Sequence, residues 1–176
     1  MAASRLLIFV IFITGSAQGA TVFNSSGGLT FENYSDGSYS LFNSLDGDAL
    51  ASGGGTLFSS SAGYTYAVDP LTGSYSLLNS LDGDALAYGD GVLYASSGGF
   101  TFTVNPLTGS YSLLNSLDGD AFAYGGGSLY ASSGGYTFSV DPLTGDYSLL
   151  NSLDGDALAY GDGVLYASSA GYTYSV

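Results

Sequence analysis

The chain has no cysteine, histidine or tryptophan, and Arg5 is its only basic residue beside fifteen acidic ones. Without cysteine there can be no disulfide, no thiolate chemistry and no cysteine-based zinc site. Nucleic-acid-binding proteins contact phosphates mainly through lysine and arginine, so we expect no nucleic-acid partner. An anionic membrane surface is excluded for the same reason. The formal net charge of −14 favours solubility but weakens the compact state by repulsion.

The same absences bear on catalysis. A serine nucleophile needs a neighbouring base, and the chain has no histidine, lysine or cysteine to provide one. Pairs of carboxylates can hydrolyse glycosidic bonds. Here, however, the acidic pairs are copied into every repeat, whereas catalysis needs one asymmetric site. We therefore expect a protein that is not an enzyme and that has no cofactor other than the calcium considered below.

The first nineteen residues differ from the rest of the chain. Arg5 precedes an apolar run over residues 6–13, and the small residues Ala17 and Gly19 follow where signal peptidase recognises its substrate. This run is too short to cross a bilayer, which takes about twenty residues. We predict a signal peptide over residues 1–19 and a single mature domain over residues 20–176. The mature chain would be secreted, to an extracellular or periplasmic location; a membrane anchor or a buried strand is the alternative.

The mature chain consists of a repeat of 36 residues. The motif Asn-Ser-Leu-Asp-Gly-Asp begins at Asn43, Asn79, Asn115 and Asn151. Each repeat has four short apolar segments separated by turns rich in glycine, serine or proline. In one repeat these segments are residues 85–88, 92–96, 100–104 and 110–114. Because the third alternates strictly between apolar and polar residues and none has a helical period, each repeat is predicted to be a four-stranded antiparallel sheet.

A sheet of this size cannot bury its faces alone, and stacked four-stranded sheets are typical of a β-propeller. The first segment carries small residues such as Ala85 and Ala87, which suit the crowded strand nearest a central axis. Counting segments predicts three complete blades, which begin near Asp46, Asp82 and Asp118, and a partial blade at each end. The chain would then be an open arc, a fragment of a larger propeller, or a ring that closes through oligomers. Unpaired blade edges favour self-association.

The repeat resembles the blades of PQQ-like and YVTN-type β-propellers. The resemblance rests on residues 91–109, Gly-Val-Leu-Tyr-Ala-Ser-Ser-Gly-Gly-Phe-Thr-Phe-Thr-Val-Asn-Pro-Leu-Thr-Gly, and its best copy is residues 66–73. It implies a propeller over nearly all of the mature chain and implies no particular chemistry. PQQ repeats usually place a tryptophan at the end of the outer strand, where this chain has Tyr75, Tyr111 and Tyr147 nearby. That difference weakens the link to quinone-dependent dehydrogenases.

Two aspartates follow the fourth segment of each repeat. Carboxylates at positions i and i+2, with serine hydroxyls and carbonyls near them, are suitable ligands for Ca²⁺. The alternative is that Asp-Gly is only turn chemistry at an exposed corner. The candidate calcium ligands are Asp46, Asp48, Asp82, Asp84, Asp118, Asp120, Asp154 and Asp156. The remaining repeat aspartates are predicted to be turn residues: Asp90 and Asp162 in hairpins, and Asp69 and Asp141 before a proline.

Our leading hypothesis for function is a secreted acidic repeat protein, a structural or binding β-propeller module with a protein or glycan partner. Two alternatives belong to other classes. In one, the chain is a fragment of a larger quinoprotein-like or glycan-active propeller enzyme whose catalytic residues lie outside it. In the other, it is an extended β-solenoid adhesin or matrix protein.

Overall fold

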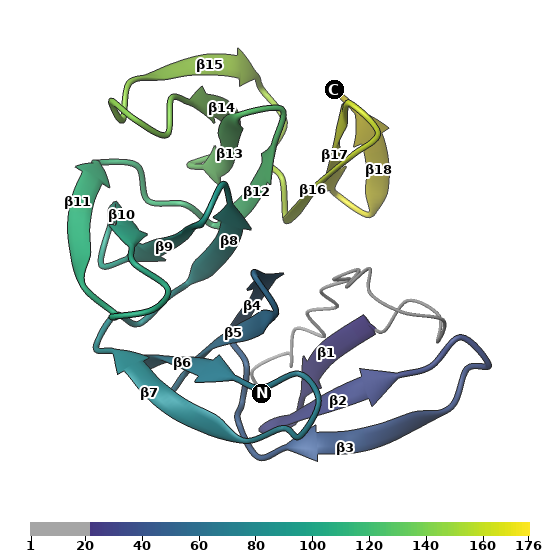
Figure 1. Cartoon of the computed structure of the whole chain (residues 1–176). Coiled ribbons are helices and arrows are strands. Elements are labelled where there is room, and N and C mark those ends of the chain that lie inside the picture. Colours follow the sequence, from purple (N-terminus) through teal and green to yellow (C-terminus); the bar gives the residue numbers. More distant parts are fainter. Residues whose placement is uncertain (1–21) are drawn as a thin grey trace, which may run out of the picture.

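The computed structural model describes residues 22–176, which form five separate antiparallel sheets around a common centre (Figure 1). These sheets are the first to fifth blades in chain order. The middle three have four strands, and the first and last have three. The prediction of an all-β propeller is thus confirmed. The expected count of three complete blades with partial ends is only partly right, because the end segments form blades of their own and the total is five.

Each blade has up to four strands in equivalent places, and the strands of the third blade agree with the predicted segments to within a residue. The inner strands are β4 (Ala49–Gly53), β8 (Ala85–Gly89), β12 (Ala121–Gly125) and β16 (Ala157–Gly161). The second strands are β1 (Val22–Ser26), β5 (Thr56–Ser61), β9 (Val92–Ser97), β13 (Ser128–Ser133) and β17 (Val164–Ser169). The third strands are β2 (Leu29–Asn33), β6 (Tyr64–Val68), β10 (Phe100–Val104), β14 (Tyr136–Val140) and β18 (Tyr172–Ser175). The outer strands are β3 (Tyr39–Asn43), β7 (Tyr75–Asn79), β11 (Tyr111–Asn115) and β15 (Tyr147–Asn151).

The inner strands β4, β8, β12 and β16 succeed one another around the centre, each next to the one before (Figure 1). Their alanines are buried where a blade follows, as at Ala85 and Ala87, because only small side chains fit between strands this close. Within residues 22–176, no strand of the fifth blade packs closely on the first blade. The repeats form separate sheets and not continuous coils, so the β-solenoid alternative is wrong.

No helix within residues 22–176 has the length and apolar character needed to cross a membrane. The predicted signal peptide over residues 1–19 lies outside the described residues.

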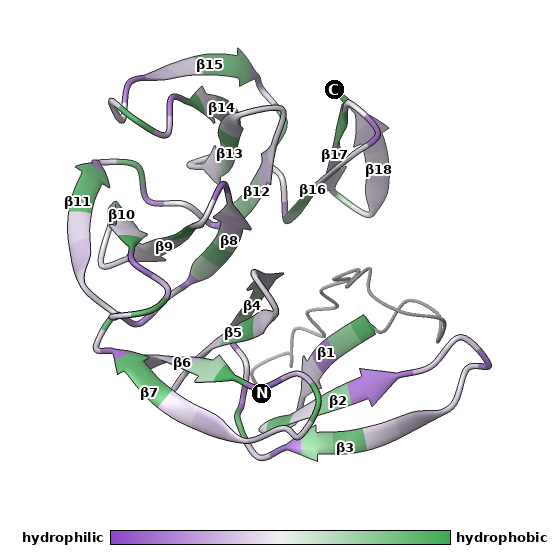
Figure 2. Ribbon diagram, in the orientation of Figure 1, coloured by the Kyte–Doolittle hydropathy of each residue, from purple (hydrophilic) through white to green (hydrophobic). Residues whose placement is uncertain are grey.

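The hydrophobic core lies between blades, with hydrophobic strands and more hydrophilic turns (Figure 2). Between the third and fourth blades, the earlier blade contributes Ala85, Ala87 and Tyr94. The later blade contributes the larger aliphatic and aromatic groups, such as Phe122 and Leu129. Because each such contact requires two blades, a blade is stable only beside its neighbour.

A tyrosine of each following blade lies flat against a glycine of the blade before. A Cβ atom added to Gly89 would be 1.8 Å from Cδ1 of Tyr124, so no other residue fits there without a shift. The Tyr124 ring also stacks on Tyr94, with ring centroids 5.5 Å apart and planes at 10°. The same three-residue contact joins the second blade to the third and the fourth to the fifth, with stacked pairs Phe58–Tyr88 and Tyr130–Tyr160.

The junction of the first and second blades is built differently. Ser52 takes the place that Tyr88 has in the next blade, since both pair with the leucine that follows the hairpin. In the first blade, Phe42 lies against Phe23, with ring centroids 4.7 Å apart, and Phe23 is fully buried. An aromatic pair therefore stabilises this junction too, although both rings come from one blade.

The first prediction concerns the glycine–tyrosine contact. Gly89→Ala should lower the free energy of unfolding by about 1–3 kcal/mol, because the new methyl group must displace the Tyr124 ring. Gly161→Ala is the matched control, since a Cβ there meets no atom within 4 Å and φ is not positive. It should be neutral or slightly stabilising. Urea unfolding of both variants measures this, and equal losses at the two positions would contradict the account.

Candidate functional site

The Asp-Gly-Asp segments all lie at one end of the blades. Each connects the outer strand of one blade to the inner strand of the next, and the turn between second and third strands reaches the same end. The hairpins after the inner strands and the turns before the outer strands lie at the opposite end. All eight candidate aspartates are exposed, whereas the glycine between each pair is buried. We call the end of the blades that carries these eight aspartates the aspartate face.

Buried hydrogen bonds anchor these loops to the preceding blade. The Thr101 hydroxyl donates to the carbonyl of Leu117 over 2.9 Å, and the N–H of Leu117 donates to Oδ1 of Asn115 over 3.0 Å. The N–H of Gly119 donates to Oγ of Ser96 over 2.9 Å. The other three loops have the same bonds, which involve Thr30, Thr65, Thr137, Ser25, Ser60 and Ser132. Hydrogen bonds of the loop backbone therefore hold neighbouring blades together.

The sequence analysis missed the threonines and serines that hold the loops. The serines stand in Ser-Ser-Gly stretches that resemble ordinary turns, and the threonines sit in alternating strands. The only signal in the sequence for their role is that each recurs at the repeat interval. In the structure, Thr101 and Ser96 are fully buried.

Neighbouring loops bring their carboxylates near one another. Partial burial, followed by repulsion from Asp82 and Asp118, raises the pKa of Asp84 above its usual value of 3.8. The charges of Asp48 and Asp120, from the loops on either side, act in the same direction. Burial and neighbouring aspartates likewise raise the pKa of Asp48. The aspartate face thus concentrates negative charge with no basic side chain to balance it.

The eight aspartates remain candidate calcium ligands. Within residues 22–176, no three or more acidic side chains are arranged so that they could hold a metal ion together. One carboxylate has a structural contact, because Oδ1 of Asp46 accepts the N–H of Gly28 over 3.2 Å. Calcium binding by the eight aspartates stays a prediction.

Four other aspartates are turn residues, as predicted. Oδ1 of Asp69 accepts the N–H of Leu71 over 2.8 Å, and Asp141 makes the same bond in the fourth blade. Asp90 and Asp162 lie in hairpins with φ of 48° and 52°. Asp90 has a second role that the sequence did not indicate.

Asp90 also binds the next blade. Its Oδ2 accepts the hydroxyl of Tyr124 over 2.7 Å. Burial and this hydrogen bond raise the pKa of Tyr124 to about 12. The hairpin thus adds a polar contact to the packing of the Tyr124 ring on Gly89.

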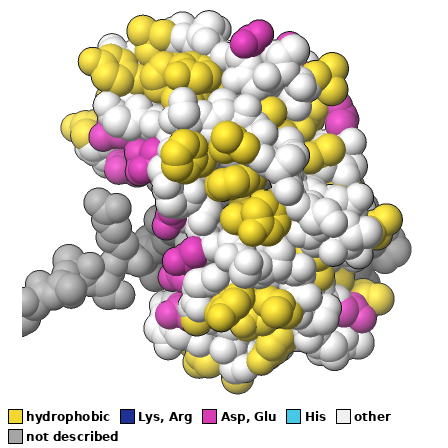
Figure 3. Space-filling view, turned by 90° about the vertical axis from the view of Figure 1, so that its left-hand side faces the viewer, with side chains coloured by type: hydrophobic (Ala, Val, Ile, Leu, Met, Phe, Trp, Pro, Cys, Tyr) yellow, Lys and Arg dark blue, Asp and Glu magenta, His cyan; other side chains and the backbone are white. Residues whose placement is uncertain are grey.

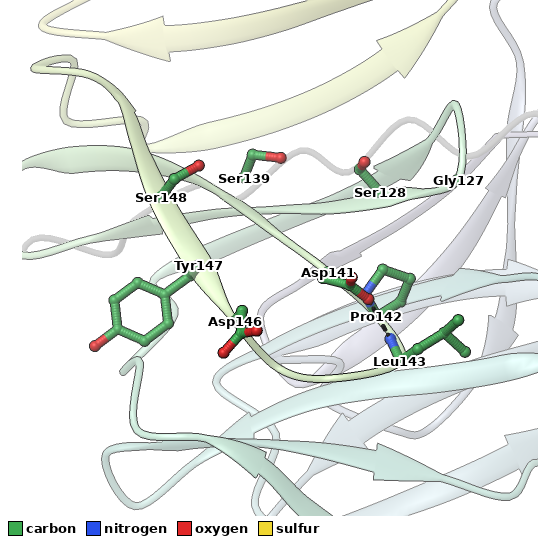
Figure 4. Close-up of a pocket in the computed structure, with 9 residues that line it drawn as sticks. All are labelled: Gly127, Ser128, Ser139, Asp141, Pro142, Leu143, Asp146, Tyr147 and Ser148. Carbon is green, nitrogen blue, oxygen red and sulfur yellow. Dashed lines mark hydrogen bonds between the residues drawn. The ribbon is translucent and has the colours of Figure 1, made fainter.

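An open hollow of about 450 Å³ lies at the opposite end from the aspartate face, beside the turn that precedes β15 (Figure 4). Asp141, Asp146 and Tyr147 line it, and Oδ1 of Asp141 accepts a hydrogen bond from the N–H of Leu143. The second blade has an equivalent hollow beside Asp69. Because these hollows recur and none of the Asp-Gly-Asp residues lines them, they are features of the repeat, separate from the candidate calcium ligands.

The rim of the ring exposes hydrophobic side chains, visible in Figure 3 as separate yellow groups. They come from the outer strands and from the tips of the turns before them. The exposed leucines are Leu41, Leu71, Leu77, Leu107, Leu113, Leu143, Leu149 and Leu150.

No protein-family model matches the sequence, and no curated protein matches it. Solved structures match the fold. A candidate gluconolactonase has a TM-score of 0.74 at 15% identity, over 89% of this chain and 70% of that one. A nidogen/laminin complex matches with a TM-score of 0.71 at 12% identity, over 85% of this chain and 67% of the other. PorZ, a surface component of the type-IX secretion system of Porphyromonas gingivalis, matches with a TM-score of 0.64 at 12% identity.

The match to PorZ covers 98% of this chain but only 25% of PorZ, so the chain spans a quarter of that protein. At these identities the similarities show the fold alone. They support a β-propeller of five blades and do not distinguish one repeat type from another. The resemblance to PQQ-like and YVTN-type repeats therefore stays a prediction.

The second prediction concerns the charge on the aspartate face. Asp84→Asn should raise the free energy of unfolding at pH 7 and low salt by about 0.5 kcal/mol or less, because it removes a repelled and partly buried charge. A raised pKa means that the folded state holds the proton more tightly than the unfolded state. The parent should therefore gain stability as the pH falls through the raised pKa, and its difference from the variant should vanish below about pH 3.8.

Asp69→Asn is the matched control, with the same change of charge at the opposite end. The hydrogen bond from Leu71 lowers the pKa of Asp69, and Asn105 shows that asparagine can accept the equivalent bond. This variant should gain no stability at pH 7. Thermal unfolding at several pH values measures both variants, and an equal gain in the control would show that total charge matters and the position does not.

Proposed function

We propose that the protein is an exported, acidic β-propeller that acts as a non-catalytic binding module through its aspartate face. One observation carries this proposal. The backbone of every Asp-Gly-Asp loop is held by buried hydrogen bonds, as at Gly119, while the flanking carboxylates stay exposed. The loops are thus rigid supports for charge, and rigid presentation reduces the entropy lost on binding.

The chemistry of this face favours a cationic ligand. Repulsion among neighbouring loops raises the pKa of Asp84, so any group that brings positive charge relieves an existing cost. The partner class we favour is a protein surface with lysine or arginine side chains, with Ca²⁺ as a simpler ligand for the same carboxylates. A glycan is the other partner class consistent with the sequence.

Secretion is supported by the residues that precede the domain and, more weakly, by structural neighbours. The run of apolar residues before Ala17 and Gly19 has the composition of a cleaved export signal. PorZ is described as a bacterial surface component. We place the mature chain outside the cytoplasm on these grounds. Self-association belongs to the same proposal, since β1 and β18 are sheet edges.

An enzyme is the second candidate, in which this chain is part of a larger propeller enzyme with catalytic residues elsewhere. The fold similarity to a candidate gluconolactonase favours it. Against it stands the repetition of the acidic groups, since the same loop recurs with the same hydrogen bonds in each repeat. The binding module therefore remains the better supported function.

The third prediction tests the aspartate face with two cations. Calcium at roughly 1 mM and a dissociation constant of about 10⁻⁴ M would add ~1.4 kcal/mol of stability per site. Melting curves are compared in EDTA, in calcium, in hexalysine and in sodium chloride at matched ionic strength. Calcium or hexalysine should stabilise the parent more than sodium does, and Asp84→Asn with Asp120→Asn should lose most of that difference.

The matched control is Asp69→Asn with Asp141→Asn, which removes the same charge at the opposite end. It should keep the response of the parent. The proposal fails if both cations act like sodium, or if the control loses as much of the response as the test variant does.

A further inference from the structure

The hollow beside the turn before β15 has an equivalent in the second blade, and each hollow is lined by one blade alone. Residues of β13, β14, β15 and the connecting turns line the first, and residues of β5, β6, β7 and their turns line the second. Both have a volume of about 450 Å³. The second blade is followed by a complete blade of four strands, β8 to β11. The hollow is therefore a property of the blade that lines it and does not depend on how far the next blade extends.

The two blades with these hollows share a hairpin of three glycines. The hairpins at residues 53–55 and 125–127 are Gly-Gly-Gly, where the third and fifth blades have Gly-Asp-Gly. The residue that follows lines the hollow and is Thr56 or Ser128, where the third blade has Val92. A hydroxyl group thus replaces a methyl group at the same place in the strand. The second and fourth blades therefore have a polar wall where the third has an apolar side chain.

The hydroxyl groups of the fourth-blade hollow are not used by their own strands. Ser139 and Ser148 oppose each other in the register of β14 and β15. Their equivalents in the third blade, Thr103 and Ser112, hydrogen-bond each other over 2.9 Å. No such bond links the two serines in Figure 4, where Ser128 lies beside them along the same wall. Three hydroxyl groups on this wall can therefore bind a ligand.

Two carboxylates stand opposite the serines (Figure 4). Asp141 is held in place because its Oδ1 accepts the N–H of Leu143 over 2.8 Å, and its Oδ2 remains to accept from a ligand. Asp146 is exposed and is particular to this blade, since the equivalent residues of the second and third blades are Ser74 and Ser110. The hollow of the fourth blade therefore has more acceptors than its equivalents.

This lining favours a neutral ligand rich in hydroxyl groups. Within residues 22–176 there is no basic side chain, so the carboxylates repel an anion with nothing to offset them. A hydroxyl group can donate to a carboxylate and can both donate to and accept from a serine, and bonds to a carboxylate are the stronger ones. A metal ion fits less well, because only two carboxylates line the hollow. The volume lies in the range of small-molecule sites, about 300–1,000 Å³.

We propose that the hollow of the fourth blade, formed by Ser128, Ser139, Asp141, Asp146 and Ser148, binds a neutral sugar unit of a glycan. The sugar hydroxyls donate to Asp141 and Asp146 and exchange hydrogen bonds with the serines. The ring of Tyr147 points away from the serines, so hydrogen bonds and not aromatic stacking carry the recognition (Figure 4). The hollow lies at the opposite end from the aspartate face, so either proposal can fail without the other.

The hollow of the second blade is a weaker copy of this site. It keeps Thr56, Asp69 and Ser76 but has Ala67 where the fourth blade has Ser139, and it lacks the second carboxylate. Two sites on one chain favour a polymer over a free sugar, because the second contact with a polymer is intramolecular. A glycan with several exposed neutral sugars is therefore the ligand that this arrangement fits.

The test titrates the ¹⁵N-labelled chain without residues 1–19, in EDTA, with the methyl glycosides of glucose, galactose, mannose and N-acetylglucosamine. At least one should bind saturably, with a dissociation constant of about 10⁻³ M. The amide shifts should centre on Gly127, Asp141, Asp146 and Ser148. Galacturonate should not bind because it is an anion, and glycerol should not saturate. A neutral polysaccharide of the sugar that binds should bind more tightly than the methyl glycoside, by about tenfold or more.

Two variants import the residue that another blade has at the same place, so the fold should tolerate them. Asp146→Ser follows Ser110 and should weaken sugar binding by about tenfold, because a bond to a charged acceptor is lost. Ser128→Val follows Val92 and should weaken it by about fivefold. Asp84→Asn removes the same charge as the first variant, but on the aspartate face, and should bind like the parent.

Several results would overturn the proposal: no saturable binding by any of the four glycosides, equal binding of glycerol, or parental affinity of Asp146→Ser. An equal loss in Asp84→Asn would show that total charge and not the hollow controls binding. Binding that appears only when calcium replaces EDTA would assign the ligand to a metal ion. If the polysaccharide binds no more tightly than the glycoside, the ligand is a free sugar and the assignment to a glycan is wrong.

Discussion

The contact between consecutive blades is the interaction on which the whole structure depends. One segment makes it: a loop anchored by Thr101 and Ser96 at one end, and a tyrosine ring against Gly89 at the other. With no cysteine in the chain and no basic residue within residues 22–176, neither disulfides nor side-chain ion pairs can hold the blades. Burial of apolar surface and a few well-placed hydrogen bonds must do so.

This constraint also explains the chemistry that the molecule exposes. The loop backbone holds blades together, so the flanking carboxylates are carried on an anchored backbone. The raised pKa of Asp84 reflects their crowding. The last blade differs from the third, since Tyr166 is exposed whereas its equivalent, Tyr94, is buried.

Much of the fold followed from the repeat. The interval of 36 residues, the four segments and the alanines at Ala85 and Ala87 predicted the blades and their inner strands. The link between Asp90 and Tyr124 could not be predicted, because it joins residues 34 apart whose proximity depends on how blades pack. For the candidate site, the sequence located the aspartates, and repulsion from aspartates of the neighbouring loops contributes to the raised pKa of Asp84. Whether they bind a cation depends on side-chain geometry that spacing alone does not determine.

The most direct test of the central claim compares one hydrogen bond in two settings. Thr101→Val keeps the shape of the side chain but removes the donor to the buried carbonyl of Leu117. Thr173→Val makes the same change in the fifth blade, where the threonine is exposed. Urea unfolding should show a loss of about 1–3 kcal/mol for the first and a change within about 0.5 kcal/mol for the second. Equal effects, or no effect at Thr101, would contradict the claim that the loop anchor holds the blades together.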